Sequence, residues 1–180
     1  EIMREEAIFS GFGGQGVLSM GMMLAYSGML ENKEVCWFPS YGPEMRGGTA
    51  NCIVQVADGL ISSPIISQFD TVVALNQPSV DKFELKVKPG GALIYDAANI
   101  LTKPTRTDIS VFGIPASDEA LKLKNLKVMN MIVLGAFIKA RKTVPSDTVI
   151  KALFEVLPER HHKLIPLNKE AFYVGMGLID

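Results

Sequence analysis

The chain has 180 residues, of which 48% are hydrophobic, and its formal net charge is −1. This length suits one domain with a full core and is too short for two ordinary ones. The composition excludes a disordered chain, and the near-zero charge gives no electrostatic reason to expect nucleic-acid binding.

No apolar run is long enough to span a bilayer, so we expect no membrane segment. Arg4, Glu5 and Glu6 precede the first short apolar strand, a pattern unlike that of a signal peptide. We therefore expect a cytoplasmic protein. Cys36 and Cys52 are the only cysteines, and both are expected to be free thiols in apolar strands.

The first half of the chain reads as strands separated by one strongly apolar helix. The expected strands cover residues 7–10, 34–38, 49–56 and 70–75, and the helix covers residues 17–30. A glycine turn at residues 11–16 joins the first strand to that helix. A short helix is expected from Pro78 to Val87, because proline suits the first helical turn.

The second half continues the alternation and then becomes helical. Pro89-Gly90-Gly91 is expected to form a turn before a buried strand at residues 92–95, and a further strand covers residues 109–112. The clearest later helices cover residues 128–141 and 146–156, with Ser146 expected as the N-cap of the second. Alternating strands and helices predict an α/β fold: a Rossmann-like, mainly parallel sheet with helices on both faces, in a single domain.

The glycine turn at residues 11–16 is the first candidate site. Gly11, Gly13 and Gly16 fit Gly-x-Gly-x-x-Gly, a pattern that presents backbone N–H groups to a phosphate at a helix N-terminus. Gly14 and Gln15 complete the turn, and we expect them to contact the same ligand. Glycine required only for close strand–helix packing is the alternative.

A dinucleotide site needs one further feature, an acidic residue at the end of the second strand to hold the ribose hydroxyls. That strand ends in Cys36-Trp37-Phe38-Pro39-Ser40, which contains no carboxylate. A Walker P-loop is excluded because no Gly-Lys-Ser/Thr follows the glycines. A free-standing dinucleotide-binding oxidoreductase therefore remains only an alternative.

A second glycine-centred segment, residues 40–48, contains Glu44 and Arg46. Arg46 is suited to pair bidentately with a phosphate or carboxylate, and Glu44 either contacts the ligand or holds Arg46. A surface turn with a solvated ion pair is the alternative for this segment. Asn76, which follows the strand at residues 70–75, is expected to be a second-rank contact because ligands lie past the carboxyl ends of parallel strands.

These two segments also carry a family resemblance. Gly-Phe-Gly-Gly-Gln-Gly-Val at residues 11–17 and Ser-Tyr-Gly-Pro-Glu-Met-Arg-Gly-Gly-Thr-Ala-Asn-Cys at residues 40–52 resemble the gamma subunit of 2-oxoacid:ferredoxin oxidoreductases. The likeness covers most of the chain and is greatest to the 2-oxoglutarate type. Residues 1–180 would then form one domain of this gamma type.

The resemblance implies a non-autonomous enzyme subunit. Such enzymes oxidatively decarboxylate a 2-oxoacid to an acyl-coenzyme A and pass electrons to ferredoxin. The partners implied are alpha, beta and sometimes delta subunits, which carry thiamine diphosphate, magnesium and iron–sulfur clusters. This chain would hold none of these and would contribute no catalytic residue alone; it would help to position coenzyme A through Gly11, Gly13, Gly14, Gln15, Gly16, Glu44, Arg46 and Asn76.

The two cysteines agree with that division, since no Cys-x-x-Cys is present to hold a cluster. The choice of 2-oxoacid stays open, and a subunit of an indolepyruvate- or branched-chain-specific enzyme is the alternative. Whether the isolated chain forms a homodimer also stays open. Trp37 and Phe38 are candidates for partner contact, with core packing as the other interpretation.

Overall fold

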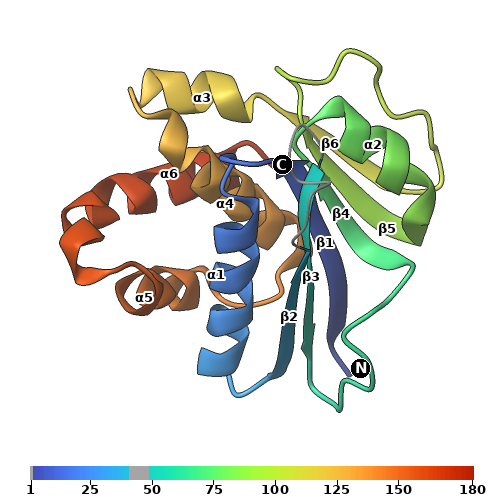
Figure 1. The fold of residues 1–180 in the computed structure, drawn as a ribbon, viewed down its shortest axis with the longest axis horizontal. Helices are drawn as coiled ribbons and strands as arrows, with labels where there is room; N and C mark the ends of the chain where they lie inside the picture. The colour runs from blue at the N-terminus through green and yellow to red at the C-terminus, as the bar shows by residue number, and fades with distance from the viewer. Residues whose placement is uncertain (1, 41–48) are drawn as a thin grey trace.

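The computed structural model describes residues 2–40 and 49–180, which form a six-stranded sheet with helices on both faces (Figure 1). The strand order is β2-β3-β1-β4-β5-β6. The strands are β1 (Arg4–Phe12), β2 (Glu34–Ser40), β3 (Thr49–Ala57), β4 (Phe69–Ala74), β5 (Val87–Asp96) and β6 (Ser110–Ile114). The expected α/β class is confirmed.

β1, β4, β5 and β6 pair in parallel, whereas β3 is antiparallel to both β1 and β2. All strands except β3 therefore point the same way. The carboxyl ends of β1, β4 and β5 meet at one edge, together with the end of β2 and the start of β3. Parallel sheets bind ligands beyond this edge.

Six α-helices of the described residues surround the sheet. They are α1 (Val17–Leu30), α2 (Gln77–Phe83), α3 (Ala116–Lys122), α4 (Met129–Arg141), α5 (Ser146–Val156) and α6 (Ile165–Gly177). α2 lies on one face, whereas α1 and α4 lie on the other, where α5 and α6 form an outer layer (Figure 1). Among the described residues, none of the helices has both the length and the hydrophobicity needed to span a membrane.

The core has two parts because alternate residues of each strand face opposite sides of the sheet. Phe9 of β1 faces the larger part, where its ring centroid lies 5.4 Å from that of Phe137 on α4. Ile8 faces the smaller part, with Val80 and Phe83 of α2. The unbroken apolar runs of β1, β4 and β5 thus reflect burial on both faces.

Three local expectations are wrong. Pro89-Gly90-Gly91 is not a turn before a strand but an irregular stretch inside the continuous β5, where the register with β4 shifts. Ser146 is not the N-cap of α5; Pro145 takes that position, and no side chain caps the helix. The strand expected at residues 34–38 continues to Ser40 and includes Pro39, which an edge strand tolerates because one side of its backbone has no ladder partner.

The two cysteines are free. Cys52 is fully buried beneath α1, and burial raises its pKa to about 12, while burial also raises the pKa of the half-buried Cys36. We expect iodoacetamide at pH 8 to leave Cys52 of the native chain unmodified and to label Cys36 slowly, since only the thiolate reacts. Mass spectrometry measures both, with the urea-unfolded chain as the control that labels fully. Equal rates in the native chain would contradict this placement.

Glu5 lies near the start of β1, at the edge of the sheet opposite the carboxyl ends of the parallel strands, and is 6% exposed. It accepts a hydrogen bond from the Thr71 hydroxyl, and its Oε2 lies 3.5 Å from Nε of Arg141. Burial raises the pKa of this carboxyl, although the Arg141 charge opposes the shift. The native state therefore retains this proton to higher pH than the unfolded chain does.

The corresponding contribution to stability is present at low pH and is lost as pH rises from about 4.5 through the raised pKa. We expect Glu5→Gln to gain stability relative to the wild type over this interval, because glutamine does not titrate. Urea unfolding at a series of pH values measures the difference. The exposed Glu155→Gln is the matched control and should follow the wild-type pH profile; parallel profiles for all three would refute the prediction.

Candidate functional site: a glycine turn between two hollows

The glycine turn lies at the carboxyl edge of the sheet, between the end of β1 and the start of α1. Gly14 has φ of 88° and Gly16, the N-cap of α1, has φ of 75°, so both adopt a conformation that L side chains rarely take. A Cβ at Gly16 would also lie 2.6 Å from the amide nitrogen of Asn130 on α4. Glycine is therefore required at position 14 by backbone conformation and at position 16 by backbone conformation and packing.

α1 begins without a side-chain cap and without an acidic residue in its first turn. The first N–H groups of a helix have no partner within the helix and carry a partial positive charge. At this helix they open beside exposed Gly13 and Gly14. This end of α1 is suited to receive an anionic group such as a phosphate.

Gln15 braces the turn from inside. Its Oε1 accepts a hydrogen bond from the Phe12 N–H at 2.6 Å, and its Nε2 donates to the Leu75 carbonyl at 3.3 Å. A Cβ at Gly11 would lie 2.6 Å from that same Oε1. In this structure the Gln15 amide thus joins the ends of β1 and β4, and its expected contact with a ligand remains a prediction.

Asn76 follows β4 and is 1% exposed. Its Oδ1 accepts from the Ser79 N–H at 2.9 Å and so caps α2, while its Nδ2 has no partner among the described residues. Asn76 does not line either of the two hollows beside the glycine turn that are described below. Its role as a second-rank contact stays a prediction. Glu44 and Arg46 lie outside the described residues, although the flanking Ser40 and Thr49 belong to strands that meet the carboxyl edge.

Two hollows flank the turn. The first, called the α1 hollow, has a volume of about 320 Å³. Its lining residues are Phe12, Gly13, Gly14, Gly16, Val17, Leu18, Ser19 and Ala50. None of these carries a negative charge, and the backbone of the first turn of α1 forms part of the wall. The α1 hollow is therefore the side of the turn on which a bound phosphate would meet N–H donors.

The second, called the β5 hollow, has a volume of about 460 Å³. Its lining residues are Gly13, Gly14, Gln15, Asn99, Ser117, Leu126 and Met129. Asn99 follows β5, and Ser117 lies in the first turn of α3. The sequence analysis missed both residues, since 18 positions separate them and only the fold brings them together.

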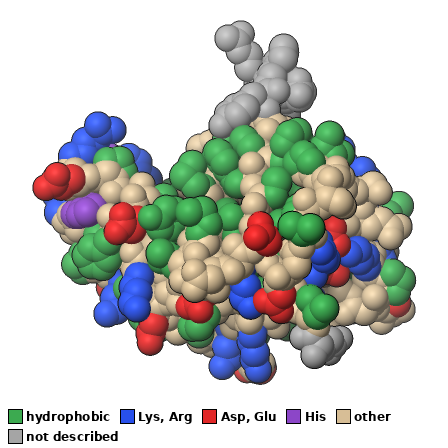
Figure 2. All heavy atoms as spheres, turned by 90° about the horizontal axis from the view of Figure 1, so that it is seen from below, with side chains coloured by type: hydrophobic (Ala, Val, Ile, Leu, Met, Phe, Trp, Pro, Cys, Tyr) green, Lys and Arg blue, Asp and Glu red, His purple; other side chains and the backbone are tan. Residues whose placement is uncertain are grey.

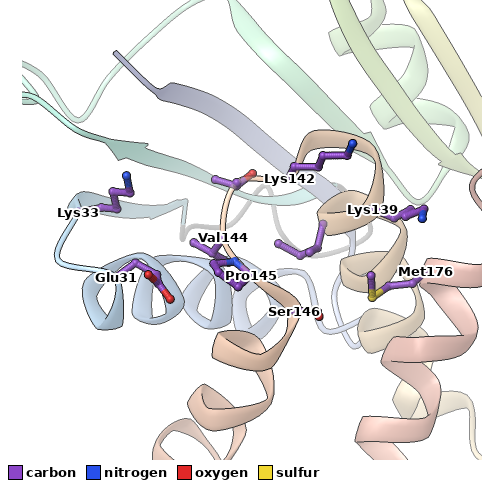
Figure 3. A pocket seen from close by; sticks show the side chains of 10 residues that line it. Glu31, Lys33, Lys139, Lys142, Val144, Pro145, Ser146 and Met176 are labelled. Carbon is purple, nitrogen blue, oxygen red and sulfur yellow. The ribbon is translucent and has the colours of Figure 1, made fainter. Parts of the chain in front are cut away.

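A larger hollow of about 510 Å³ lies at the other end of α1 (Figure 3). Its charged residues include Glu31 and Lys33, but Glu31 accepts a hydrogen bond from Thr148 and Lys33 pairs with Asp58. This hollow adjoins the carboxyl ends of α1 and α4, where the helix dipole disfavours an anion, although Lys139, Lys142 and the start of α5 also line it. Size alone therefore does not make it the better candidate.

No group of three or more His, Cys, Asp or Glu side chains within residues 2–40 and 49–180 is arranged to hold a metal ion. The antiparallel β3 also separates β2 from β1. In a dinucleotide-binding fold the second strand lies beside the first, so that its terminal acid reaches the ribose. Both the missing acid and the intervening strand thus argue against the dinucleotide alternative.

Comparison with known proteins identifies the chain's relatives. It is 34% identical over 92% of its length to ketoisovalerate oxidoreductase subunit VorA of Methanothermobacter thermautotrophicus, but it covers only 34% of that protein. It is 34% identical to 2-oxoglutarate synthase subunit KorC of Methanocaldococcus jannaschii, with 87% of this chain and 86% of the relative covered. The chain thus spans about a third of the VorA relatives and most of KorC.

Solved structures agree. The gamma subunit of a keto/oxoacid ferredoxin oxidoreductase from Geobacter sulfurreducens superposes with a TM-score of 0.85 at 29% identity, covering 97% of this chain and 95% of that one. The 2-oxoglutarate:ferredoxin oxidoreductase of Magnetococcus marinus gives a TM-score of 0.88 at 26% identity, covering 99% of this chain and 31% of that one.

The expected resemblance to oxidoreductase gamma subunits is confirmed by these matches. The sequence model of the pyruvate ferredoxin/flavodoxin oxidoreductase family matches residues 6–178, nearly the whole chain. The chain belongs to the pyruvate ferredoxin/flavodoxin oxidoreductase family.

Proposed function

We propose that this chain is the gamma subunit of a multi-subunit 2-oxoacid:ferredoxin oxidoreductase and that it helps to position coenzyme A. The assembled enzyme oxidatively decarboxylates a 2-oxoacid to an acyl-coenzyme A and passes the electrons to ferredoxin. The observation that carries the proposal is the glycine turn, whose exposed backbone opens into a hollow at the start of α1 that has no acid among its lining residues in the described part of the chain.

In this proposal the N–H groups of Gly13, Gly14 and Gly16, with the first turn of α1, hold a phosphate of coenzyme A. Arg46, which precedes Ala50 of the α1 hollow by four residues, supplies a cation to a phosphate, and Glu44 orients it. Gln15 keeps the turn in shape. Binding at the nucleotide end orients the coenzyme A thiol toward the acyl intermediate. The solved Magnetococcus enzyme, with coenzyme A and succinyl-CoA bound, supports this assignment by likeness.

The redox and decarboxylation chemistry belongs to partner subunits in this proposal. Thiamine diphosphate, magnesium and iron–sulfur clusters are assigned to alpha, beta or delta chains, since the two cysteines here occupy different strands and both have raised pKa values. The VorA and Magnetococcus relatives, roughly three times the length of this chain, support the existence of such further parts.

The surface also suits a subunit. α1 contains no charged residue, yet Met22, Met29 and Leu30 on it are 38%, 54% and 41% exposed. Phe38 is 38% exposed, whereas Trp37 packs against the larger core. Figure 2 shows hydrophobic side chains spread over one face of the molecule between the charged groups. Exposed apolar area of this kind favours association with a partner.

The substrate we propose is 2-oxoglutarate, supported by the KorC relative, whose length this chain nearly matches. A branched-chain 2-oxoacid is the second candidate, supported by identities of 34% and 39% to the VorA subunits of two Methanothermobacter species. Indolepyruvate, the remaining alternative from the sequence, has no supporting relative among those described above.

Anaerobic affinity purification of the tagged chain from its host tests the proposal. We expect thiamine- and cluster-bearing chains to copurify and the complex to reduce ferredoxin in a reaction that needs both coenzyme A and a 2-oxoacid. A panel of 2-oxoglutarate, ketoisovalerate, pyruvate and indolepyruvate then identifies the substrate. Recovery of the chain alone, with tight NAD or FAD binding, would overturn the proposal in favour of a free-standing oxidoreductase.

A further inference from the structure

The β5 hollow shares the glycine turn with the α1 hollow but has a wall of different chemistry. Besides Gly13, Gly14 and Gln15, the polar residues Asn99 and Ser117 line it. Leu126 and Met129 supply the apolar part of the lining. The volume of about 460 Å³ falls within the range of small-molecule sites.

A buried carboxylate fixes the polar wall. Asp96, at the end of β5, is 0% exposed and accepts from the Asn99 Nδ2 at 2.7 Å and from the Ser117 hydroxyl. It also accepts from the N–H groups of Ala98 and Ser117 at 3.2 and 3.3 Å. Both side chains of the wall are thus held by one buried group, which is the arrangement that preorganised binding sites use.

The same hydrogen bonds decide what the wall offers to a ligand. A carboxylate only accepts, so the Asn99 amide must turn its nitrogen toward Asp96, and that nitrogen also lies 3.0 Å from the Ser117 Oγ. Both N–H groups of the amide are therefore in use. The Asn99 Oδ1 accepts no hydrogen bond from the described residues, and the Ser117 hydroxyl already donates its hydrogen bond to Asp96. The wall presents acceptors.

An acceptor wall over a buried carboxylate repels phosphate and suits a group that donates hydrogen bonds from an apolar body. We propose that the β5 hollow binds the adenine base of a nucleotide whose phosphates lie across the glycine turn in the α1 hollow. The exocyclic amine of adenine donates to the Asn99 Oδ1, and the flat ring packs against Leu126 and Met129. This inference rests on the proposed function and adds a base-recognition site to it.

Titration of the full chain with ADP and with IDP tests the inference, because IDP replaces the amine that Asn99 is proposed to accept from with a carbonyl oxygen, which only accepts, and carries its nearest donor on N1 instead. We expect ADP to bind about tenfold more tightly than IDP, since a site built for a donor leaves its acceptor unpaired when the donor is absent. Asn99→Ala should weaken ADP binding about tenfold and remove the preference, while leaving IDP binding nearly unchanged.

Thr102→Ala is the matched control. Thr102 lies in the same loop, its side chain is exposed, and only its backbone is bonded, to Gln77. Its ADP preference and thermal unfolding should equal those of the wild type. Equal affinity of the wild type for ADP and IDP, absence of ADP binding, or a preference that survives Asn99→Ala would each overturn the inference.

A separate measurement, coenzyme A-dependent ferredoxin reduction by the purified complex, tests the proposed function. An active complex whose gamma chain does not discriminate ADP from IDP would retain the function and overturn the base site. If the chain formed no complex with this activity but showed the Asn99-dependent preference, the base site would be retained and the proposed function overturned.

Discussion

Replacing Gly135 with alanine is expected to lower the free energy of unfolding by about 3 kcal/mol or more. Gly135 lies on α4 where it crosses α6, and a Cβ there would lie 1.9 Å from the carbonyl oxygen of Phe172. The obstacle is backbone, so no side-chain rotation relieves it. The helices must move apart, and the packing beneath them is lost.

Gly175, on the α6 side of the same helix crossing, is expected to behave in the same way. A Cβ at Gly175 on α6 would lie 1.8 Å from the carbonyl oxygen of Ile132, so Gly175→Ala should be comparably destabilising. Urea and thermal unfolding of each variant measure the effect. Gly177→Ala is the control on the same helix, because a Cβ there meets no atom within 4 Å. Similar stability of the Gly135 and Gly177 variants would show that the helices do not cross this closely.

Much of the fold follows from local pattern. The expected helix at residues 17–30 coincides with α1, since a glycine N-cap with positive φ precedes a run of fourteen residues without a charge. The expected helix at residues 146–156 likewise coincides with α5. Alternation and apolar runs place all six strands, with ends that differ by a few residues.

Strand order does not follow from such patterns. The insertion of β3 between β1 and β2 depends on which strand edges remain free once the helices pack, and no local periodicity reports this. The error at Pro89-Gly90-Gly91 has a related cause. Proline and glycine normally interrupt a strand, but here the neighbouring β4 shifts register and Gly90 adopts φ of 81°.

The candidate site was predictable in part. The glycine turn could be found because its conformations require glycine, and its place at the carboxyl edge follows from a parallel sheet. Asn99 and Ser117 could not be found, since neither residue type is unusual in a loop or a helix start. The one available signal was Asp96, a carboxylate ending an apolar strand, which had to find buried partners.

Gln15 is a residue whose role the sequence pattern leaves open. Its place inside the glycine turn suggests an amide offered to a ligand, but both ends of the amide bond to the protein. A side chain within a binding motif can thus serve the shape of the motif. We expect replacements of Gln15 to act through the conformation of the turn.

The second large effect expected is on coenzyme A, from substitutions in the glycine turn. Gly14→Val should raise the KM for coenzyme A in the purified complex tenfold or more, about 1.4 kcal/mol, while leaving single-turnover decarboxylation of the 2-oxoacid intact. Gly14 has φ of 88°, which a β-branched residue does not adopt, so the N–H groups of the turn would leave their positions. Steady-state kinetics and release of carbon dioxide measure the two halves of the reaction separately.

Gly13→Ala separates occupancy of the site from distortion of the turn. Gly13 has no positive φ, and a Cβ there meets no atom within 4 Å, so this variant should fold normally. Its methyl group would nevertheless stand between the two hollows and should raise the KM for coenzyme A by a smaller factor. Gly59→Ala, equally unobstructed but in the loop after β3, should match the wild type. If all three variants used coenzyme A as the wild type does, the turn would not hold the nucleotide, and its glycines would serve only the crossing of β1 and α1.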